Sequence, residues 1–199
     1  FFKNSYNLVT NITYVIIVSL LLIVFNSFHE SGNLFSNSFV SNSFTNFFKI
    51  LVLLGTLFVM LITQKYIKEM KINYFEYPLL LLFSVLGMFF MISSNDLMSF
   101  YLGLELQSLA LYILASIDRD NLKSNESGIK YFVLSALSSG LLLYGCSLLY
   151  GFTGSTNFEE INLKIELENT GAIFAMVFIL VSLAFKVSAV PFHMWTPDV

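Results

Sequence analysis

Long apolar stretches separated by short polar segments dominate the hydrophobic pattern of this chain. A helix needs about 20 mostly apolar residues to span a bilayer. None of the long stretches shows the strict alternation of apolar and polar residues that is typical of a half-buried strand. The pattern therefore predicts an all-α polytopic membrane protein with about six transmembrane helices. We expect these helices over residues 12–28, 47–66, 78–93, 97–117, 128–150 and 171–192.

The segments between these stretches differ in character. Residues 29–45 are rich in Ser and Asn, so we expect an irregular or interfacial loop there. Residues 94–96 form a tight turn, in which the Asp96 side chain can cap the helix that follows. Residues 151–170 are acidic and are predicted to form a longer loop that holds a short surface helix.

The composition supports a membrane protein and excludes some functions. Charged residues make up 12% of the chain, about half of the roughly 25% found in soluble domains, and the mean hydropathy is +0.76. The net charge is -3 with no basic cluster, so nucleic-acid binding has no support. The single cysteine, Cys146, lies in an apolar stretch and is interpreted as a packing residue. The abundance of Phe, Tyr and Asn favours an AT-rich, organellar genome.

Basic residues are distributed unevenly between the two membrane sides. We call the side that holds the N-terminus side A and the opposite side B. Side A receives Lys3, Lys65, Lys68, Lys71, Arg119 and Lys123, whereas side B receives Lys49 and Lys164. Because positive charge accumulates on the inner side of membranes, side A is predicted to be the matrix or cytoplasm, with loops 67–77 and 118–126 on it.

Glu105 stands in the middle of an apolar stretch, where a charge costs roughly 2.5–3.5 kcal/mol on insertion scales. Tyr101, Glu105, Ser108 and Tyr112 follow the spacing i, i+4, i+7, i+11, which places them on one polar stripe of a helix. An ion or proton role explains this costly carboxylate. A hydrogen-bonded glutamate that only fixes helix packing is the alternative.

Lys186 repeats this pattern, because Ser182, Lys186 and His193 share one helical stripe. Pro191 removes the backbone hydrogen bond to Val187 and is expected to disturb the helix there. Exposed carbonyl groups beside a buried lysine are tolerated only in a polar or water-filled site, and broken helices of this kind mark ion sites in transporters. A lysine that extends to the membrane surface is the alternative.

Five further residues in and after the last two predicted helices are of interest. Lys130 lies one turn into its predicted helix, so it either extends to the interface or finds a buried partner. His193 could relay protons near neutral pH, and Trp195 is interpreted as an interface anchor. Ser135 and Ser139 form a pair of small residues four apart, which permits close helix contact.

A glutamate and a lysine inside one helix bundle suit proton transfer. When the two groups are paired, each stabilises the charged form of the other, and when they separate, burial favours their neutral forms. A change that moves the pair apart can therefore release or capture a proton. Pairing of Glu105 with Lys186 would explain why the chain keeps both residues.

Two stretches, "FFMISSNDLMSFYLGLELQSLALYILAS" (89–116) and "LAFKVSAVPFHMWTPDV" (183–199), resemble the subunit 2 family of mitochondrial NADH:ubiquinone oxidoreductase, respiratory complex I. The segment 127–158 resembles the same family. The resemblance implies an antiporter-like fold with inverted five-helix repeats. Residues 1–76 would then be N-terminal peripheral transmembrane helices, and residues 77–199 an incomplete first repeat.

The resemblance also implies roles for individual residues. Glu105, Lys130 and Lys186 match the glutamate and the lysines that the family uses for proton transfer, and Pro191 lies in the break motif of its helix. The complex would be an NADH:ubiquinone reductase that pumps protons, while this chain would carry no redox chemistry and no cofactor. The FMN, the iron–sulfur clusters and the quinone are expected elsewhere in the complex.

The expected partners are other membrane-arm subunits, membrane lipids and a second polypeptide that carries the rest of a split subunit. The expected location is the mitochondrial inner membrane. Two alternatives remain: a cation/proton antiporter subunit outside complex I, and a structural scaffold of the membrane arm without its own proton transfer.

Overall fold

The computed structural model describes residues 5–69, 74–165 and 169–199. Its elements are α1 Ser5–Asn26, β1 Gly32–Leu34, β2 Phe39–Ser41, α2 Ser43–Glu69, α3 Glu76–Ser93, α4 Leu97–Ala115, α5 Leu122–Thr153, α6 Phe158–Lys164, α7 Thr170–Lys186 and the 3-10 helix Thr196–Asp198. Within the described residues, α1 to α5 are long and apolar enough to cross a membrane, and α7 is a shorter apolar helix. The prediction of an all-α membrane protein with about six membrane helices is confirmed.

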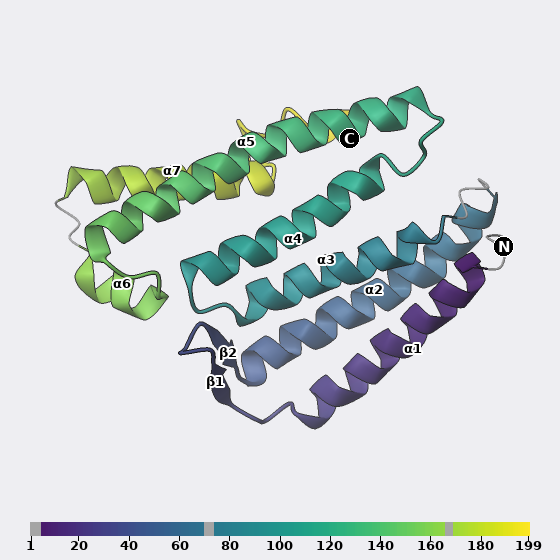
Figure 1. Ribbon diagram of the computed structural model, residues 1–199, viewed down its shortest axis with the longest axis horizontal. Coiled ribbons are helices and arrows are strands. Elements are labelled where there is room, and N and C mark those ends of the chain that lie inside the picture. The colour runs from purple at the N-terminus through teal and green to yellow at the C-terminus, as the bar shows by residue number, and fades with distance from the viewer. Residues whose placement is uncertain (1–4, 70–73, 166–168) are drawn as a thin grey trace.

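The five long helices lie side by side in chain order, neighbours run in opposite directions, and α7 packs along α5 (Figure 1). The N-terminal end of α1 and the α4–α5 connection lie at one end of this arrangement (right in Figure 1), while the hairpin, the α3–α4 turn and α6 lie at the other. An ion pair of 3.3 Å between Arg119 and Glu76 joins the α4–α5 connection to the start of α3. Lys3 and Lys71 lie outside the described residues, as does the side chain of Lys68.

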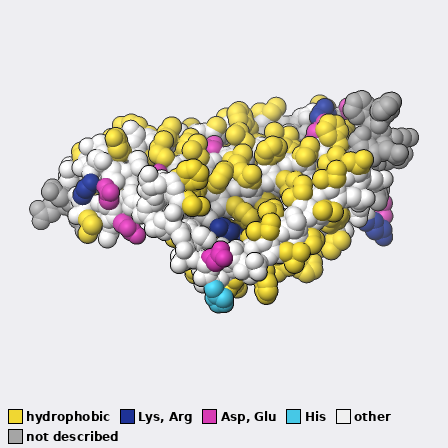
Figure 2. Space-filling model, turned by 60° about the horizontal axis from the view of Figure 1, so that its bottom comes forward, with side chains coloured by type: hydrophobic (Ala, Val, Ile, Leu, Met, Phe, Trp, Pro, Cys, Tyr) yellow, Lys and Arg dark blue, Asp and Glu magenta, His cyan; other side chains and the backbone are white. Residues whose placement is uncertain are grey.

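Two hydrophobic clusters hold the helices together. One joins α1, α2 and α3 through Ile17, Leu53, Met60 and Val85. The other joins α4, α5, α6 and α7 and contains the buried Cys146, as expected for a packing residue. Hydrophobic side chains are spread over much of the face drawn in Figure 2. This outward apolar surface is what a bilayer requires of spanning helices.

The segment 29–45 differs from the loop that was expected. It contains an antiparallel hairpin in which Gly32 pairs with Ser41. Its turn passes through Phe35, Ser36 and Asn37, all with positive φ. Strands of only three residues are too short for their periodicity to be read from the sequence. Asn95 in the α3–α4 turn donates its backbone N–H to the Ser38 carbonyl at 2.8 Å, which fixes the hairpin against the bundle.

Helix α4 is positioned by a close crossing with α3 and by its cap. A Cβ atom on Gly87 would lie 2.5 Å from the backbone nitrogen of Gln107, and one on Gly103 would lie 2.9 Å from the Gly87 carbonyl oxygen. Only glycine allows the two backbones to come this close. Asp96 caps α4 as predicted, because its Oδ1 accepts from the Met98 N–H at 2.8 Å.

Helix α7 ends at Lys186, six residues earlier than the pattern predicted. Ser188 has a φ of 56°, so the chain leaves the helix before Pro191, and Pro191 and His193 lie outside α7. The following segment returns to the bundle, where the Trp195 ring stacks on Tyr131 with a centroid separation of 4.7 Å. The expected stripe of Ser182, Lys186 and His193 is therefore wrong beyond Lys186.

Candidate functional site

The ammonium group of Lys186, on the last turn of α7, is held by hydroxyl groups from two other helices. Its Nζ donates to Ser108 Oγ at 3.2 Å and Tyr112 Oη at 3.2 Å on α4, and to Ser135 Oγ at 3.1 Å on α5. Three acceptors match the three donors of an ammonium group. The lysine therefore extends into the bundle and not to the membrane surface. We call these three side chains the hydroxyl cage.

Glu105 lies beside this cage on α4. Its Oε1 is 3.6 Å from Lys186 Nζ, and the two side chains are only 20% and 12% exposed. This separation is too long for a hydrogen bond, and Oε1 is buried with no hydrogen-bond partner in the described part of the chain. The contact is therefore a charge–charge interaction in which the lysine has several hydrogen bonds and this carboxylate oxygen has none.

The polar stripe on α4 explains why one helix supplies most of the site. Glu105, Ser108 and Tyr112 follow the i, i+3, i+7 spacing, so they share one face. The apolar Leu102 and Leu109 lie on the outer, exposed face. The sequence stripe is thus the inner face of α4, which is turned toward α5 and α7.

A pair of serines fixes α7 against α5 one turn before Lys186. Ser182 Oγ donates to the Ser138 carbonyl at 2.6 Å, and Ser138 Oγ donates to the Ser182 carbonyl at 3.1 Å. Both residues are fully buried. These reciprocal bonds satisfy two hydroxyl groups inside the bundle, and they define the depth and rotation at which α7 presents Lys186.

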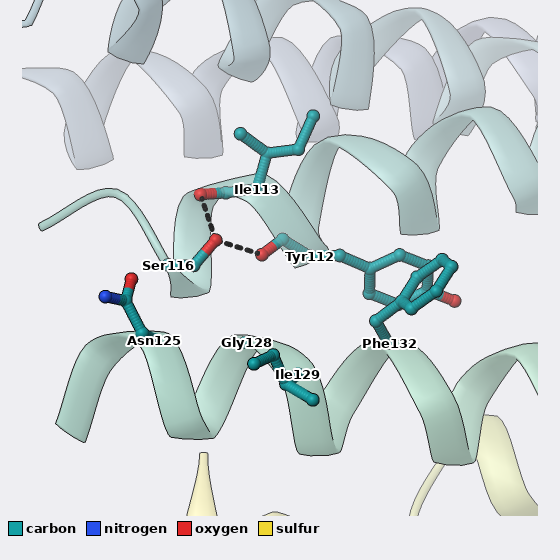
Figure 3. Close-up of a pocket in the computed structure, with 7 residues that line it drawn as sticks. All are labelled: Tyr112, Ile113, Ser116, Asn125, Gly128, Ile129 and Phe132. Atoms are coloured by element: carbon teal, nitrogen blue, oxygen red, sulfur yellow. Dashed lines mark hydrogen bonds between the residues drawn. The ribbon is translucent and has the colours of Figure 1, made fainter. Parts of the chain in front are cut away.

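A groove of about 500 Å³ runs between the end of α4 and the start of α5. Figure 3 shows the side chains of Tyr112, Ser116 and Asn125 among those that line it. A Cβ on Gly128 would lie 2.5 Å from the Ser116 Cβ, so this glycine keeps the two helices close at the groove. Because the Tyr112 hydroxyl also binds Lys186, Tyr112 connects the groove to the buried ammonium group.

Aromatic side chains link the cage to the segment after α7. The rings of Tyr112 and Tyr131 meet edge to face at 4.8 Å, and Tyr131 stacks on Trp195. The indole Nε1 of Trp195 donates to the Phe185 carbonyl at 3.2 Å, next to Lys186. Trp195 therefore holds the end of α7 against α5 in addition to any role at the interface.

The other predicted site residues are Lys130, Pro191 and His193. Lys130 forms an ion pair of 2.7 Å with Glu126, one turn earlier on α5, and its side chain is 43% exposed. It sits deeper in its helix than predicted, because α5 begins at Leu122. Pro191 and His193 are exposed. The part of the chain that the structure describes contains no group of three His, Cys, Asp or Glu side chains suited to a metal ion.

Sequence reasoning did not assign the hydroxyl cage as part of the site. Ser108 and Tyr112 were predicted to share the polar stripe of Glu105, and this spacing could have assigned them to the site. Ser135 was interpreted only as a small packing residue, because periodicity does not say which neighbouring helix a side chain faces.

The fold and the site define a class: a multi-pass helical membrane protein with a lysine and a glutamate buried between three helices. A family model described as NADH:quinone oxidoreductase/Mrp antiporter, TM matches residues 94–199, which include the whole site. The chain belongs to this family.

Individual relatives agree with this placement. The chain is 58% identical over 198 residues to NADH-quinone oxidoreductase subunit N of Pelagibacter ubique, covering 99% of this chain and 42% of that protein. A solved structure of respiratory complex I from Thermus thermophilus with bound aureothin contains a chain that matches with a TM-score of 0.81 at 30% identity, over 98% of this chain and 42% of the other. The Mrp complex from Dietzia shares the fold, with a TM-score of 0.78 at 22% identity, over 96% of this chain and 38% of that one.

These relatives confirm the resemblance to the antiporter-like subunits of complex I. The chain spans about two fifths of the length of the relatives it matches. The mitochondrial origin and the division of the chain at residues 76 and 77 stay predictions.

Proposed function

We propose that this chain carries a proton-transfer site of the membrane arm of a respiratory NADH:quinone oxidoreductase. One observation carries the proposal: a largely buried lysine ammonium group is bound by three hydroxyl groups and lies 3.6 Å from a buried carboxylate oxygen. Ionisable groups inside a membrane are costly and mark ion or proton pathways. The relatives named NADH-quinone oxidoreductase subunit N support the choice of complex.

In this proposal the proton is held on Lys186 Nζ while Glu105 is close and negatively charged. If Glu105 moves away or becomes protonated, the ammonium group loses its counter-charge and burial favours the neutral amine. The released proton passes to a neighbouring hydroxyl group, since each hydroxyl both accepts and donates. We propose the Tyr112 hydroxyl as the first acceptor, because it binds Lys186 Nζ and belongs to a residue that lines the groove between α4 and α5.

The groove lies near the end of the molecule that holds the α4–α5 connection, which the positive-charge pattern assigns to side A. We place loops 67–77 and 118–126 on the matrix or cytoplasmic side. The residue composition, which favours an organellar genome, supports the mitochondrial inner membrane as the location. The ion pair between Arg119 and Glu76 supports a common side for these two segments. Proton exchange through the groove would then occur with that inner compartment.

The redox chemistry is proposed to lie elsewhere in the complex, with FMN, iron–sulfur clusters and quinone in other subunits, which are also the expected partners. A complete path across the membrane also requires the part of the family fold that lies outside these 199 residues. The expectation that a second polypeptide carries this part stays a prediction.

The decisive experiment replaces Glu105 with Gln and Lys186 with Ala in the assembled complex, in sealed proteoliposomes. Proton uptake is measured per NADH oxidised. We expect the number of protons per NADH, or the coupled NADH oxidation itself, to fall in both variants. The control is Lys65→Ala, because the Lys65 side chain is 86% exposed in its pair with Glu69. Full assembly with unchanged stoichiometry in both variants would contradict the assignment and favour a structural scaffold.

The antiporter alternative makes a different biochemical prediction. A subunit of a cation/proton antiporter outside any redox complex would copurify without flavin or iron–sulfur proteins. Copurification of this chain with such proteins would support the NADH:quinone oxidoreductase assignment.

A further inference from the structure

Lys49 on α2 is an unusual cation for its position. It is one of two basic residues that the charge pattern assigns to side B. Its side chain is half-buried, and it makes no hydrogen bond or ion pair with the residues at 5–69, 74–165 and 169–199. The first turn of α2 contains no acidic residue. A partly buried ammonium group without a counter-charge is unfavourable, so Lys49 favours an anion from outside the chain.

The surroundings of Lys49 are strongly apolar. It lines a pocket of about 250 Å³ between the β-hairpin, α2 and the end of α3, and the pocket wall contains Phe35, Phe39, Phe89 and Phe90 but no Asp or Glu. The Phe39 ring lies 5.7 Å from the Phe90 ring. Phe35 and Phe90 are 78% and 41% exposed. The pocket thus combines one positive charge with an open phenyl-lined wall.

Hydrogen bonds between the hairpin and the end of α3 hold the walls of the pocket in place. Phe39 forms an isolated antiparallel bridge with Ser94 at the end of α3. The Asn95 side chain donates to the Asn37 carbonyl at 3.2 Å. These bonds hold the hairpin against α3, so the phenyl wall keeps its shape without a ligand.

The position along α2 identifies the chemistry of the occupant. Lys49 is six residues after the start of α2 at Ser43, which is about 9 Å along the helix axis. From this position, near one end of an apolar helix long enough to cross a membrane, a lysine reaches the boundary between hydrocarbon and headgroups by extending its flexible side chain. An anionic phospholipid fits both halves of the pocket, since it carries a phosphodiester charge at this depth and an acyl chain below it.

We propose that the pocket formed by the hairpin, α2 and α3 binds an anionic phospholipid, with its phosphodiester group on Lys49 and an acyl chain against the phenyl wall. This site is independent of the proton-transfer proposal, because it lies on other helices and its test needs no turnover.

The test is a titration of the purified protein in detergent, in which native mass spectrometry counts bound phosphatidylglycerol or phosphatidylcholine with identical acyl chains. We expect one phosphatidylglycerol to bind more tightly than phosphatidylcholine. Lys49→Gln should weaken the binding of phosphatidylglycerol about five-fold, the effect of one lysine near an anionic surface, and leave phosphatidylcholine unchanged. Lys49→Arg should retain the preference. Lys65→Gln, at the exposed far end of the same helix, is the matched control.

Several outcomes would overturn this proposal. Equal affinity of the unaltered protein for the two lipids would show that the lipid charge does not matter. This result needs no variant, so it is informative even if Lys49→Gln fails to fold. Unchanged phosphatidylglycerol binding in Lys49→Gln would do the same. Displacement of the lipid by excess inorganic phosphate would indicate a site for small anions. In the assembled complex, a carbodiimide cross-link from Lys49 to another subunit's carboxylate would assign the pocket to a protein partner.

Discussion

Replacing Lys186 with methionine should destabilise the fold far more than replacing Glu105 with glutamine. The reason is an asymmetry in the site: Lys186 has three hydroxyl acceptors, whereas Glu105 Oε1 has no hydrogen-bond partner among the described residues. Methionine leaves a buried carboxylate without its cation. Glutamine leaves an ammonium group that is still hydrogen-bonded.

The magnitudes follow from the geometry. At 3.6 Å the attraction between two unit charges is about 4–5 kcal/mol with an effective dielectric constant of about 20. The desolvation of a buried carboxylate costs several kcal/mol, so Glu105→Gln removes two terms of similar size and opposite sign. We expect a change in unfolding free energy within about 2 kcal/mol. For Lys186→Met we expect a loss of about 3–5 kcal/mol, as found when one partner of a buried pair is removed.

The assay is thermal or denaturant unfolding of the purified protein in detergent micelles, followed by helical circular dichroism. Lys164→Met is the matched control, because Lys164 pairs with Glu160 at 3.1 Å but both side chains are at least 50% exposed, and exposed pairs contribute about 0–1 kcal/mol. Equal losses for Lys186→Met and Glu105→Gln, or a larger loss for Glu105→Gln, would refute the asymmetry.

Three further predictions concern packing, the cage and the surface. Gly87→Ala should lower the stability by about 1–3 kcal/mol, because the added Cβ would meet the backbone of α4 at 2.5 Å; the yield and unfolding midpoint of the purified protein measure this. Ser135→Ala should reduce proton translocation, because it removes one of the three hydroxyl groups that accept from Lys186. Ser135→Thr keeps a hydroxyl group and should retain translocation. An unchanged rate in Ser135→Ala would argue against the hydroxyl cage. The hydrogen bond from Lys164 lowers the pKa of Glu160, so their pairing stabilises the fold above the ordinary carboxyl pKa and is lost as the pH falls through the lowered value. The difference in unfolding midpoint between the unaltered protein and Lys164→Gln should therefore be present at neutral pH and absent in strong acid.

The helices themselves were predictable, because each is a long apolar stretch and the polar connections are distinct. Their ends were less predictable. The polar residues after Asn121 read as a loop, but the Asn121 side chain accepts from the Lys123 N–H at 3.0 Å and starts α5 there. By contrast, α7 ends at Lys186 although the residues that follow are still mostly apolar, so the hydrophobic pattern does not predict this helix end.

The candidate site was partly predictable for a physical reason. The polar stripe on α4 predicted which face of the helix carries Glu105. The cost of burying two unpaired charges suggested Lys186 as its partner, and the structure places Lys186 Nζ 3.6 Å from Glu105 Oε1. The rotation of α5 relative to α7 depends on packing that no single-helix period encodes, so Ser135 and the bonds between Ser138 and Ser182 could not be assigned. Their roles in proton transfer stay predictions.

The division of the site among α4, α5 and α7 has a consequence for how the protein is made. During synthesis the helix with Glu105 is complete before the helix with Lys186 exists, since Lys186 follows about eighty residues later. At roughly 5–20 residues per second, the nascent chain waits on the order of 4–16 seconds with a carboxylate that has no cation. Until α7 is made, α4 carries this carboxylate at a cost of roughly 2.5–3.5 kcal/mol on insertion scales, and pairing with Lys186 can offset that cost only after α7 has been inserted.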